Sequence, residues 1–340
     1  MLAILAASHG INDFLAGWLL GGDLPTAPGW MRLPWLVVYA ALAFGGQLPA
    51  AWLLGRSRRL DVWMVAALAL MAATVAVRSH SAAEAILLSG VASAICHVAG
   101  GALALQLPGA ARAIGWFAAP GVVGLAAGGW LARNSAAPPV WMMAAPLILL
   151  GACVALRTCW PVGSENRRAD EPPAIDGHDW LMLLLLLALT LRSALWDLVQ
   201  MAAVGNGPAL FAVALAGAVG KVMGGWAASR WPSVRHTSAA LLGACVLLEF
   251  ARGHLVGLCA GVALLQSAIP SSIYLLHRSF GATPAAAAAY GLGLTVALGG
   301  LAAPAFSQAP SLVLGLAAAA LAVWHFAPRG RAHPVEAGAM

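Results

Sequence analysis

The residues best placed to do chemistry are His9 and Asp13, which stand four apart in an apolar stretch near the N-terminus. On a helix this spacing puts both side chains, together with that of Asn12, on one face. A carboxylate and an imidazole this close titrate as a coupled unit, so the sequence predicts a pair that binds and releases a proton. A satisfied hydrogen bond between two helices is the structural alternative.

Five other polar residues lie inside long apolar stretches, and we expect them, with Asn12, to bind a substrate. They are His97, Arg192, Asp197, Lys221 and Gln266. Charge within hydrocarbon is costly, so such groups face a cavity or a partner helix. Arg192 can hold an anionic group through a bidentate fork, and Lys221 can do so as a point charge. Mutual pairing of these two cations with Asp13 and Asp197 is the structural alternative.

The sequence contains no pattern that predicts a cofactor, a metal site or an enzyme. Cys96 precedes His97, but consecutive side chains on a helix point about 100° apart, so the two are poor joint ligands. A lone buried structural histidine is the alternative for His97. The five cysteines show no paired spacing. Because neither a Ser-His-Asp nor a His-Glu-x-x-His arrangement is present, we expect no catalytic residues.

Composition defines the kind of scaffold that must position these residues. Of 340 residues, 61% are apolar, 38 are glycine and only 9% are charged, against a charged share of about 25% in soluble domains. A soluble globular protein is therefore excluded. Because a membrane-spanning helix needs ~20 apolar residues, the chain has room for about twelve spans and none for a separate soluble catalytic domain.

The apolar runs divide into two sets of six. The first set is predicted at residues 2–21, 35–54, 61–78, 84–106, 112–132 and 139–158, and the second at 180–204, 208–229, 236–251, 254–276, 284–304 and 309–327. We therefore predict an all-α integral membrane protein of 12 transmembrane helices in two pseudo-symmetric six-helix halves. The halves are residues 1–160 and 180–328, joined by a polar cytoplasmic linker, 161–179, and followed by a cytoplasmic tail, 329–340.

The placement of arginine predicts the orientation. With the N-terminus in the cytoplasm, 12 arginines flank the inner ends of the spans and four flank the outer ends, as the positive-inside rule requires. This bias explains the net charge of +6 without a nucleic-acid partner. We expect a multi-pass protein of a bacterial inner membrane, with both termini cytoplasmic and the lipid bilayer around it.

Two prolines inside predicted spans have small or polar neighbours. In the fifth span Pro120 is followed by Gly121, Gly124 and Gly128 on one face, a pattern that permits close helix packing. In the tenth span Pro270 lies among polar residues. Proline breaks the hydrogen-bond ladder of a helix, so a kink at Pro270 serves either gating or packing.

Two short motifs resemble a known family. Ser8-His9-Gly10-Ile11-Asn12-Asp13-Phe14 is similar to the Ser-His-x-x-Asn-Asp-Phe of the fosmidomycin-resistance-like branch of the major facilitator superfamily and of related uncharacterised bacterial carriers. Ser93-Ala94-Ile95-Cys96-His97 is similar to that branch's small-residue run ending in Phe-His. The resemblance implies the major facilitator fold, a monomer and a proton-coupled transporter. It also implies that helices one, four, seven and ten line a cavity, and therefore that His97, Arg192 and Gln266 line the substrate path.

The leading hypothesis is a secondary transporter that moves a small anionic or amphipathic solute by alternating access. Its direction would be efflux or exchange against protons, with Asp13 and His9 as the proton-responsive pair. A non-transporting membrane subunit or assembly factor is the first alternative. An integral-membrane enzyme acting on lipid is the second.

Overall fold

The computed structural model describes most of the chain. The described residues are 1–26, 29–57, 59–134, 141–156, 177–203, 206–231, 233–250, 253–278, 282–305 and 309–326. The predicted linker, 161–179, lies outside them apart from its last three residues, and the predicted tail, 329–340, lies outside them entirely.

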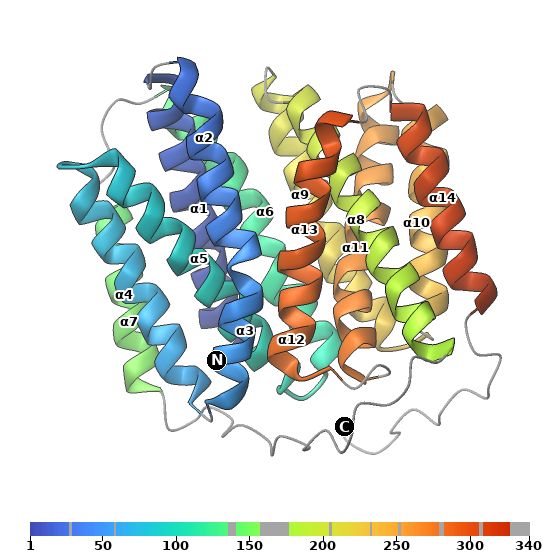
Figure 1. Ribbon diagram of the computed structural model, residues 1–340, viewed down its shortest axis with the longest axis horizontal. Helices are drawn as coiled ribbons and strands as arrows, with labels where there is room; N and C mark the ends of the chain where they lie inside the picture. Colours follow the sequence, from blue (N-terminus) through green and yellow to red (C-terminus); the bar gives the residue numbers. More distant parts are fainter. Residues whose placement is uncertain are drawn as a thin grey trace.

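Helices make up the described chain (Figure 1). The first half contains α1 (Leu2–Thr26), α2 (Gly29–Ala40), the π-helical turn η1 (Ala41–Gly45), α3 (Gln47–Arg56), α4 (Leu60–Arg78), α5 (Ala82–Leu105), α6 (Ala110–Asn134) and α7 (Trp141–Ala155). The second half contains α8 (Gly177–Ala203), α9 (Gly207–Ala228), α10 (Ser233–Phe250), α11 (Leu255–Arg278), α12 (Pro284–Ala289), the π-helical turn η3 (Tyr290–Leu294), α13 (Thr295–Ala302), the short 3-10 turn η4 (Ala303–Ala305) and α14 (Ala309–Phe326).

The prediction of twelve helical spans is confirmed. The elements α2, η1 and α3 follow one another along one span, as do α12, η3, α13 and η4, so the described residues contain twelve helical segments. Among the described residues, eight of these helical segments are long and apolar enough to cross a membrane. Two segments differ in extent from the prediction, because α1 continues to Thr26 and the next helix begins at Gly29.

The longer α1 has a packing reason. In the sequence Gly21 and Gly22 are typical of a helix break, which is why the first span was expected to end there. In the structure a Cβ atom at Gly21 would meet the backbone of Gly129 in α6. The glycines therefore form a contact surface within a continuing helix.

Polar caps start three of the helices. The side-chain oxygens of Ser81, Asn206 and Thr283 each accept a hydrogen bond of 3.2 Å from the backbone N–H three residues later. They begin α5, α9 and α12, where the first backbone N–H groups have no partner within the helix.

Small residues let neighbouring helices approach closely. Within the first half, a Cβ atom at Gly124 or Gly128 of α6 would meet the carbonyl oxygens of Gly10 and Phe14 of α1. The predicted packing face of α6 is thus present, and it lies against α1. Such backbone-to-backbone contact fixes the height of α1 relative to α6.

The two halves meet where α6 crosses α9 and where α12 packs on the first half. Where α6 crosses α9, Gly115 lies against the Lys221 backbone and Gly225 against the Ala111 backbone. Helix α12 packs on α5 and also on α3. Figure 1 shows α3 and α12 side by side at the end of the bundle that carries the N label.

Candidate functional site

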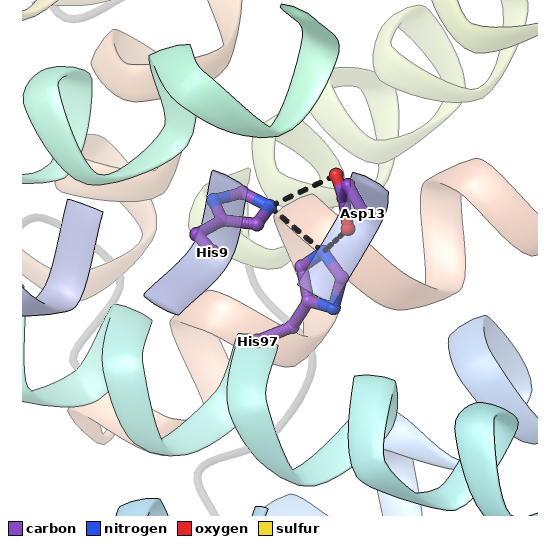
Figure 2. A group of neighbouring side chains, drawn as sticks. All are labelled: His9, Asp13 and His97. Atoms are coloured by element: carbon purple, nitrogen blue, oxygen red, sulfur yellow. Dashed lines mark hydrogen bonds and ion pairs between the residues drawn. The ribbon is translucent and has the colours of Figure 1, made fainter. Parts of the chain in front are cut away.

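The structure brings together three of the predicted site residues, His9 and Asp13 from α1 and His97 from α5 (Figure 2). The two Nε2 atoms lie 3.0 Å apart. The Asp13 carboxylate lies beside both, with Oδ2 3.3 Å from His9 Nε2 and Oδ1 3.6 Å from His97 Nε2. We call these three side chains the His–Asp–His cluster.

The other nitrogen of each histidine is held by a backbone carbonyl. His9 Nδ1 lies 2.8 Å from the Phe117 oxygen, and His97 Nδ1 lies 2.7 Å from the Ser93 oxygen. A carbonyl oxygen only accepts, so each Nδ1 must carry a hydrogen. In two neutral histidines the facing Nε2 atoms would then both present lone pairs. The close Nε2 contact therefore needs one positive charge between the rings, and a single shared proton satisfies it.

Asn12 and Ser93 orient the side chains of the cluster through hydrogen bonds. Asn12 Nδ2 donates to Asp13 Oδ1 at 2.8 Å and to Ser93 Oγ at 3.1 Å, and Ser93 Oγ lies 3.2 Å from His97 Nδ1. The ring of Phe117 stacks on His9 with centroids 4.6 Å apart. Side chains from α1, α5 and α6 thus fix both rings and the carboxylate.

Burial within the cluster is uneven. The side chains of His9 and His97 are 2% and 6% exposed, whereas that of Asp13 is 19% exposed. On the α6 side, a Cβ atom at Gly121 would collide with Asp13 Oδ2 and His9 Nε2. The cluster therefore lies directly on the α6 backbone, and the Asp13 carboxylate is its most exposed member.

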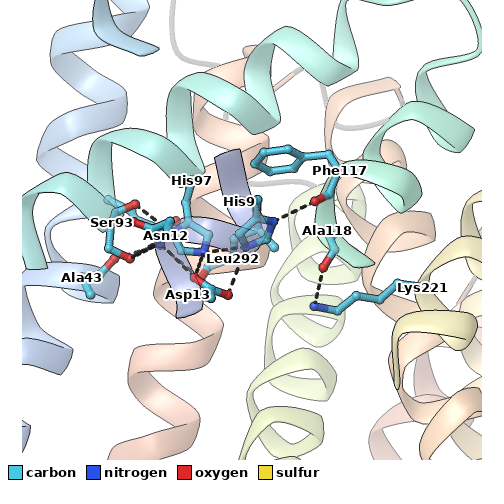
Figure 3. Close-up of polar contacts among 11 residues, drawn as sticks. His9, Asn12, Asp13, Ala43, Ser93, His97, Phe117, Ala118, Lys221 and Leu292 are labelled. Carbon is cyan, nitrogen blue, oxygen red and sulfur yellow. Dashed lines mark hydrogen bonds and ion pairs between the residues drawn. The ribbon is translucent and has the colours of Figure 1, made fainter. Parts of the chain in front are cut away.

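Helix α6 also contacts a charged residue of the second half (Figure 3). Its Phe117 oxygen accepts from His9, and the next carbonyl, that of Ala118, accepts from Lys221 Nζ of α9 at 3.1 Å. Pro120 follows in the same turn of α6, where its missing N–H removes the hydrogen bond to the carbonyl of Trp116, the residue just before Phe117. Two successive peptide groups of α6 thus connect the cluster to the one lysine of the chain.

Two other predicted substrate residues are buried with free polar atoms. Arg192 and Gln266 are 3% and 1% exposed. Within the described residues, the Arg192 Nε atom and both side-chain polar atoms of Gln266 have no hydrogen-bond partner. Unpaired buried polar groups are costly, so each of these atoms lacks a partner that a stable interior normally supplies.

Arg192 and Asp197, whose pairing was the structural alternative, form no ion pair in the part of the chain that the structure describes. Arg192 Nη1 donates to Ser193 Oγ at 3.2 Å. The Asp197 carboxylate lies beside Gly300 of α13. The five-residue spacing explains this, because it is one position off the four-residue repeat that aligns side chains on a helix.

Hydroxyl groups surround Pro270 in α11. Ser271 Oγ donates to the carbonyls of Ser267 and Ala268, and Ser272 Oγ donates to that of Ala268. Ser271 Oγ also lies 2.9 Å from Thr237 Oγ1 of α10. The polar residues around Pro270 therefore join α11 to α10 as well as bonding to their own helix.

Sequence reasoning missed Ser93, the two α6 carbonyls and Gln47. The fully buried Gln47 Nε2 donates to the Ala43 oxygen at 2.9 Å and, across the two halves, to the Leu292 oxygen at 3.3 Å. A glutamine within an apolar run is a signal for it. Backbone carbonyls leave no such signal beyond a nearby proline.

An exposed charged contact lies at the start of α4, outside the spans. Arg59 Nε and Nη2 donate to the Asp61 carboxylate at 3.0 and 2.9 Å, at the start of α4. The hydrogen bonds and the negative charge of this carboxylate raise the pKa of Arg59. Because the Arg59 side chain is exposed, the pair contributes little to stability.

No family model and no curated protein matches the chain. Among solved structures, it is similar to two of the E. coli fucose:proton symporter FucP, one of a variant and one in the outward conformation. Each has a TM-score of 0.68, is 14% identical and covers 96% of this chain and 97% of that one. The chain is also similar to the human organic anion transporter MFSD10 (TETRAN), with a TM-score of 0.58, 14% identity, and coverage of 96% and 98%.

Identities this low show the fold and nothing finer. The likeness nevertheless extends over nearly the whole length of both chains. It agrees with the twelve helical segments and with the two halves that meet along α6 and α9. The chain therefore has the major facilitator fold, the multi-pass membrane fold that these transporters share.

Proposed function

We propose that the protein is a proton-coupled secondary transporter of a small anionic or amphipathic solute, working by alternating access in the direction of efflux or exchange. The observation that carries the proposal is the His–Asp–His cluster. Its two facing Nε2 atoms need a positive charge between them, and Asp13 balances that charge. A transported proton is the simplest such charge.

The position of the cluster supports coupling. His9 and Lys221 bind successive carbonyls of α6, although they belong to different halves. In alternating access the two halves move relative to one another around a central site. Gain or loss of the proton would change the hydrogen bond from His9 to the Phe117 carbonyl of α6. The next carbonyl of α6 is the one that Lys221 of the second half contacts.

The second half supplies the groups for an anionic solute. Arg192, Lys221 and Gln266 are all buried, and Arg192 and Gln266 have unpaired atoms. Asn12, His97 and Asp197 complete the proposed substrate set. The alternative that these polar residues are purely structural accounts less well for the unpaired amide of Gln266, because a structural amide is normally bonded.

Several finer features belong to the same proposal. We place the protein in a bacterial inner membrane as a monomer, with both termini cytoplasmic, two halves at 1–160 and 180–328, and no resident cofactor. Membership of the fosmidomycin-resistance-like branch remains a prediction from the two motifs. So does a gating role for Pro270.

The test measures proton movement directly. Everted vesicles carrying the protein are given a pH gradient that a quenched dye reports, and are challenged with organic acids, amino acids, phosphonates, antibiotics and metal ions. We expect one class of compound to collapse the gradient with wild type. Glu84→Gln, which neutralises an exposed carboxylate, is the control and should respond in the same way. We expect no response with Asp13→Asn at matched expression.

The opposite results are equally informative. A response that survives in Asp13→Asn would remove the cluster from the coupling mechanism. No response to any compound, together with a partner that copurifies at a fixed ratio, would favour the non-transporting subunit over the transporter.

A further inference from the structure

We propose that the His–Asp–His cluster is also a binding site for a divalent first-row transition-metal cation, with Zn²⁺ as the representative ion. The ligands are His9 Nε2, His97 Nε2 and the Asp13 carboxylate. The inference rests on the same donors as the proposed function, since the metal takes the place of the shared proton.

The spacing of the donors fits such an ion. Tetrahedral Zn²⁺ with bonds of ~2.0–2.1 Å holds neighbouring donor atoms roughly 3.3–3.4 Å apart. The facing contacts of the cluster are 3.0 Å between the two Nε2 atoms, 3.3 Å from His9 Nε2 to Asp13 Oδ2, and 3.6 Å from His97 Nε2 to Asp13 Oδ1. One donor atom from each residue can be chosen so that all three lie within 4.8 Å of one another.

The surroundings of the histidines also match those of metal ligands. A ligating imidazole usually donates its second N–H to a carbonyl or carboxylate, which fixes the tautomer and the ring orientation. His9 does this to the Phe117 oxygen and His97 to the Ser93 oxygen. With Nδ1 occupied in this way, Nε2 is the nitrogen of each ring that is left to bind a metal ion, and both Nε2 atoms lie beside the Asp13 carboxylate.

The donor set selects the class of ion. Two imidazole nitrogens and one carboxylate suit Zn²⁺, Co²⁺ or Ni²⁺, whereas Mg²⁺ and Ca²⁺ prefer all-oxygen sites. Three protein ligands leave a fourth position open for water or an anionic solute. The partly exposed Asp13 side chain provides the access that an exchangeable ion requires.

Residue spacing along the chain does not predict this metal site, because His97 is far from His9 and Asp13 in the sequence. The ligands come from α1 and α5, and the positions of these helices relative to each other are set by contacts within the folded bundle. Glycine at position 121 is part of that arrangement. A side chain there would occupy the space of two of the donors.

The experiment uses the purified full chain in detergent, without a histidine tag, titrated with Co²⁺. We expect intense visible bands typical of four-coordinate Co²⁺, saturating at one ion per chain, with displacement by Zn²⁺ but not by Mg²⁺. His97→Ala and Asp13→Asn should each weaken binding at least tenfold. His254→Ala, which removes an exposed histidine, should leave binding unchanged.

Each outcome has a defined meaning. Elution volume and thermal unfolding identify any variant that fails to fold, and Gly121→Ala then replaces it, because it blocks the donors without removing them. A weak, six-coordinate Co²⁺ spectrum that is the same in wild type and variants overturns the metal site. That result leaves the proton proposal standing if the vesicle assay responds. The converse result is Co²⁺ binding by the cluster in a protein that moves no protons in the vesicle assay. That result would support the metal site and contradict the proposed proton coupling.

Discussion

Gly121 is the residue through which α6 touches the His–Asp–His cluster. We expect Gly121→Ala to abolish the collapse of the pH gradient that an added compound causes with wild type. We also expect it to reduce Co²⁺ binding, because the added methyl group would displace Asp13 Oδ2 and His9 Nε2. Overpacking of this kind costs about 1–3 kcal/mol, so the protein should still fold. The vesicle assay and the Co²⁺ titration measure the two losses.

The same helix offers a matched control. At Gly129 a Cβ atom would meet nothing nearer than a backbone oxygen 3.6 Å away. Gly129→Ala should therefore keep both activities. If Gly121→Ala also kept them, α6 would not constrain the cluster, and its role would reduce to packing against α1.

At this scale the sequence predicted part of the site. The four-residue spacing was enough to place His9 and Asp13 together, whereas His97 was predicted as a substrate-binding residue. Ser93 and the carbonyls of Phe117 and Ala118 were not predictable. Their roles depend on the rotation of α5 and α6 about their own axes, which only the packed structure fixes.

Among the elements, α1 and α6 depend most on small residues. We expect Gly128→Ala to lower the melting temperature, since the methyl group would collide with the Phe14 carbonyl and force two helix backbones apart. A destabilisation of about 1–3 kcal/mol is expected for such overpacking. Thermal unfolding followed by the fluorescence of an environment-sensitive dye measures it.

A glycine on the surface of α7 provides the comparison. A Cβ atom at Gly151 has no neighbour within 4 Å, so Gly151→Ala should leave stability unchanged or raise it slightly, because alanine favours helix. An equal fall in melting temperature in Gly128→Ala and Gly151→Ala would mean that α1 and α6 can move apart without loss of stability.

The elements themselves were largely predictable, because spans of a membrane protein are read from apolar runs of sufficient length. The end of the first span was predicted wrongly, because Gly21 lies at a close contact between α1 and α6 and does not end the helix. The π-helical turns η1 and η3 were also not predictable. They lie on the two helices that Gln47 and Leu292 connect across the halves, and nothing in the local sequence distinguishes a π turn from an α turn.

For the whole molecule, the question is how the halves separate. In this structure α6 and α9 pack against each other as far as Trp130 and Phe211. At the end of the bundle that carries the N-terminus, the halves also meet through α3 and α12 and through the contact of Gly225 with Ala111. Arginine placement predicts that this is the cytoplasmic end. A transporter must open this contact in part of its cycle, so a bulky residue within it should favour the open state.

Gly225 tests this contact, because its position lies against the Ala111 backbone with no room for a side chain. We expect Gly225→Leu to prevent the closed arrangement and to abolish transport while the protein still folds. Spin labels at the exposed positions Arg56 and Arg278, in a cysteine-free background, should then report a longer distance by pulsed electron paramagnetic resonance. Gly151→Leu, on the open surface of α7, should leave the distance as in wild type. An unchanged distance in Gly225→Leu would mean that the α6–α9 crossing is a fixed pivot, and that the halves separate by rocking about it.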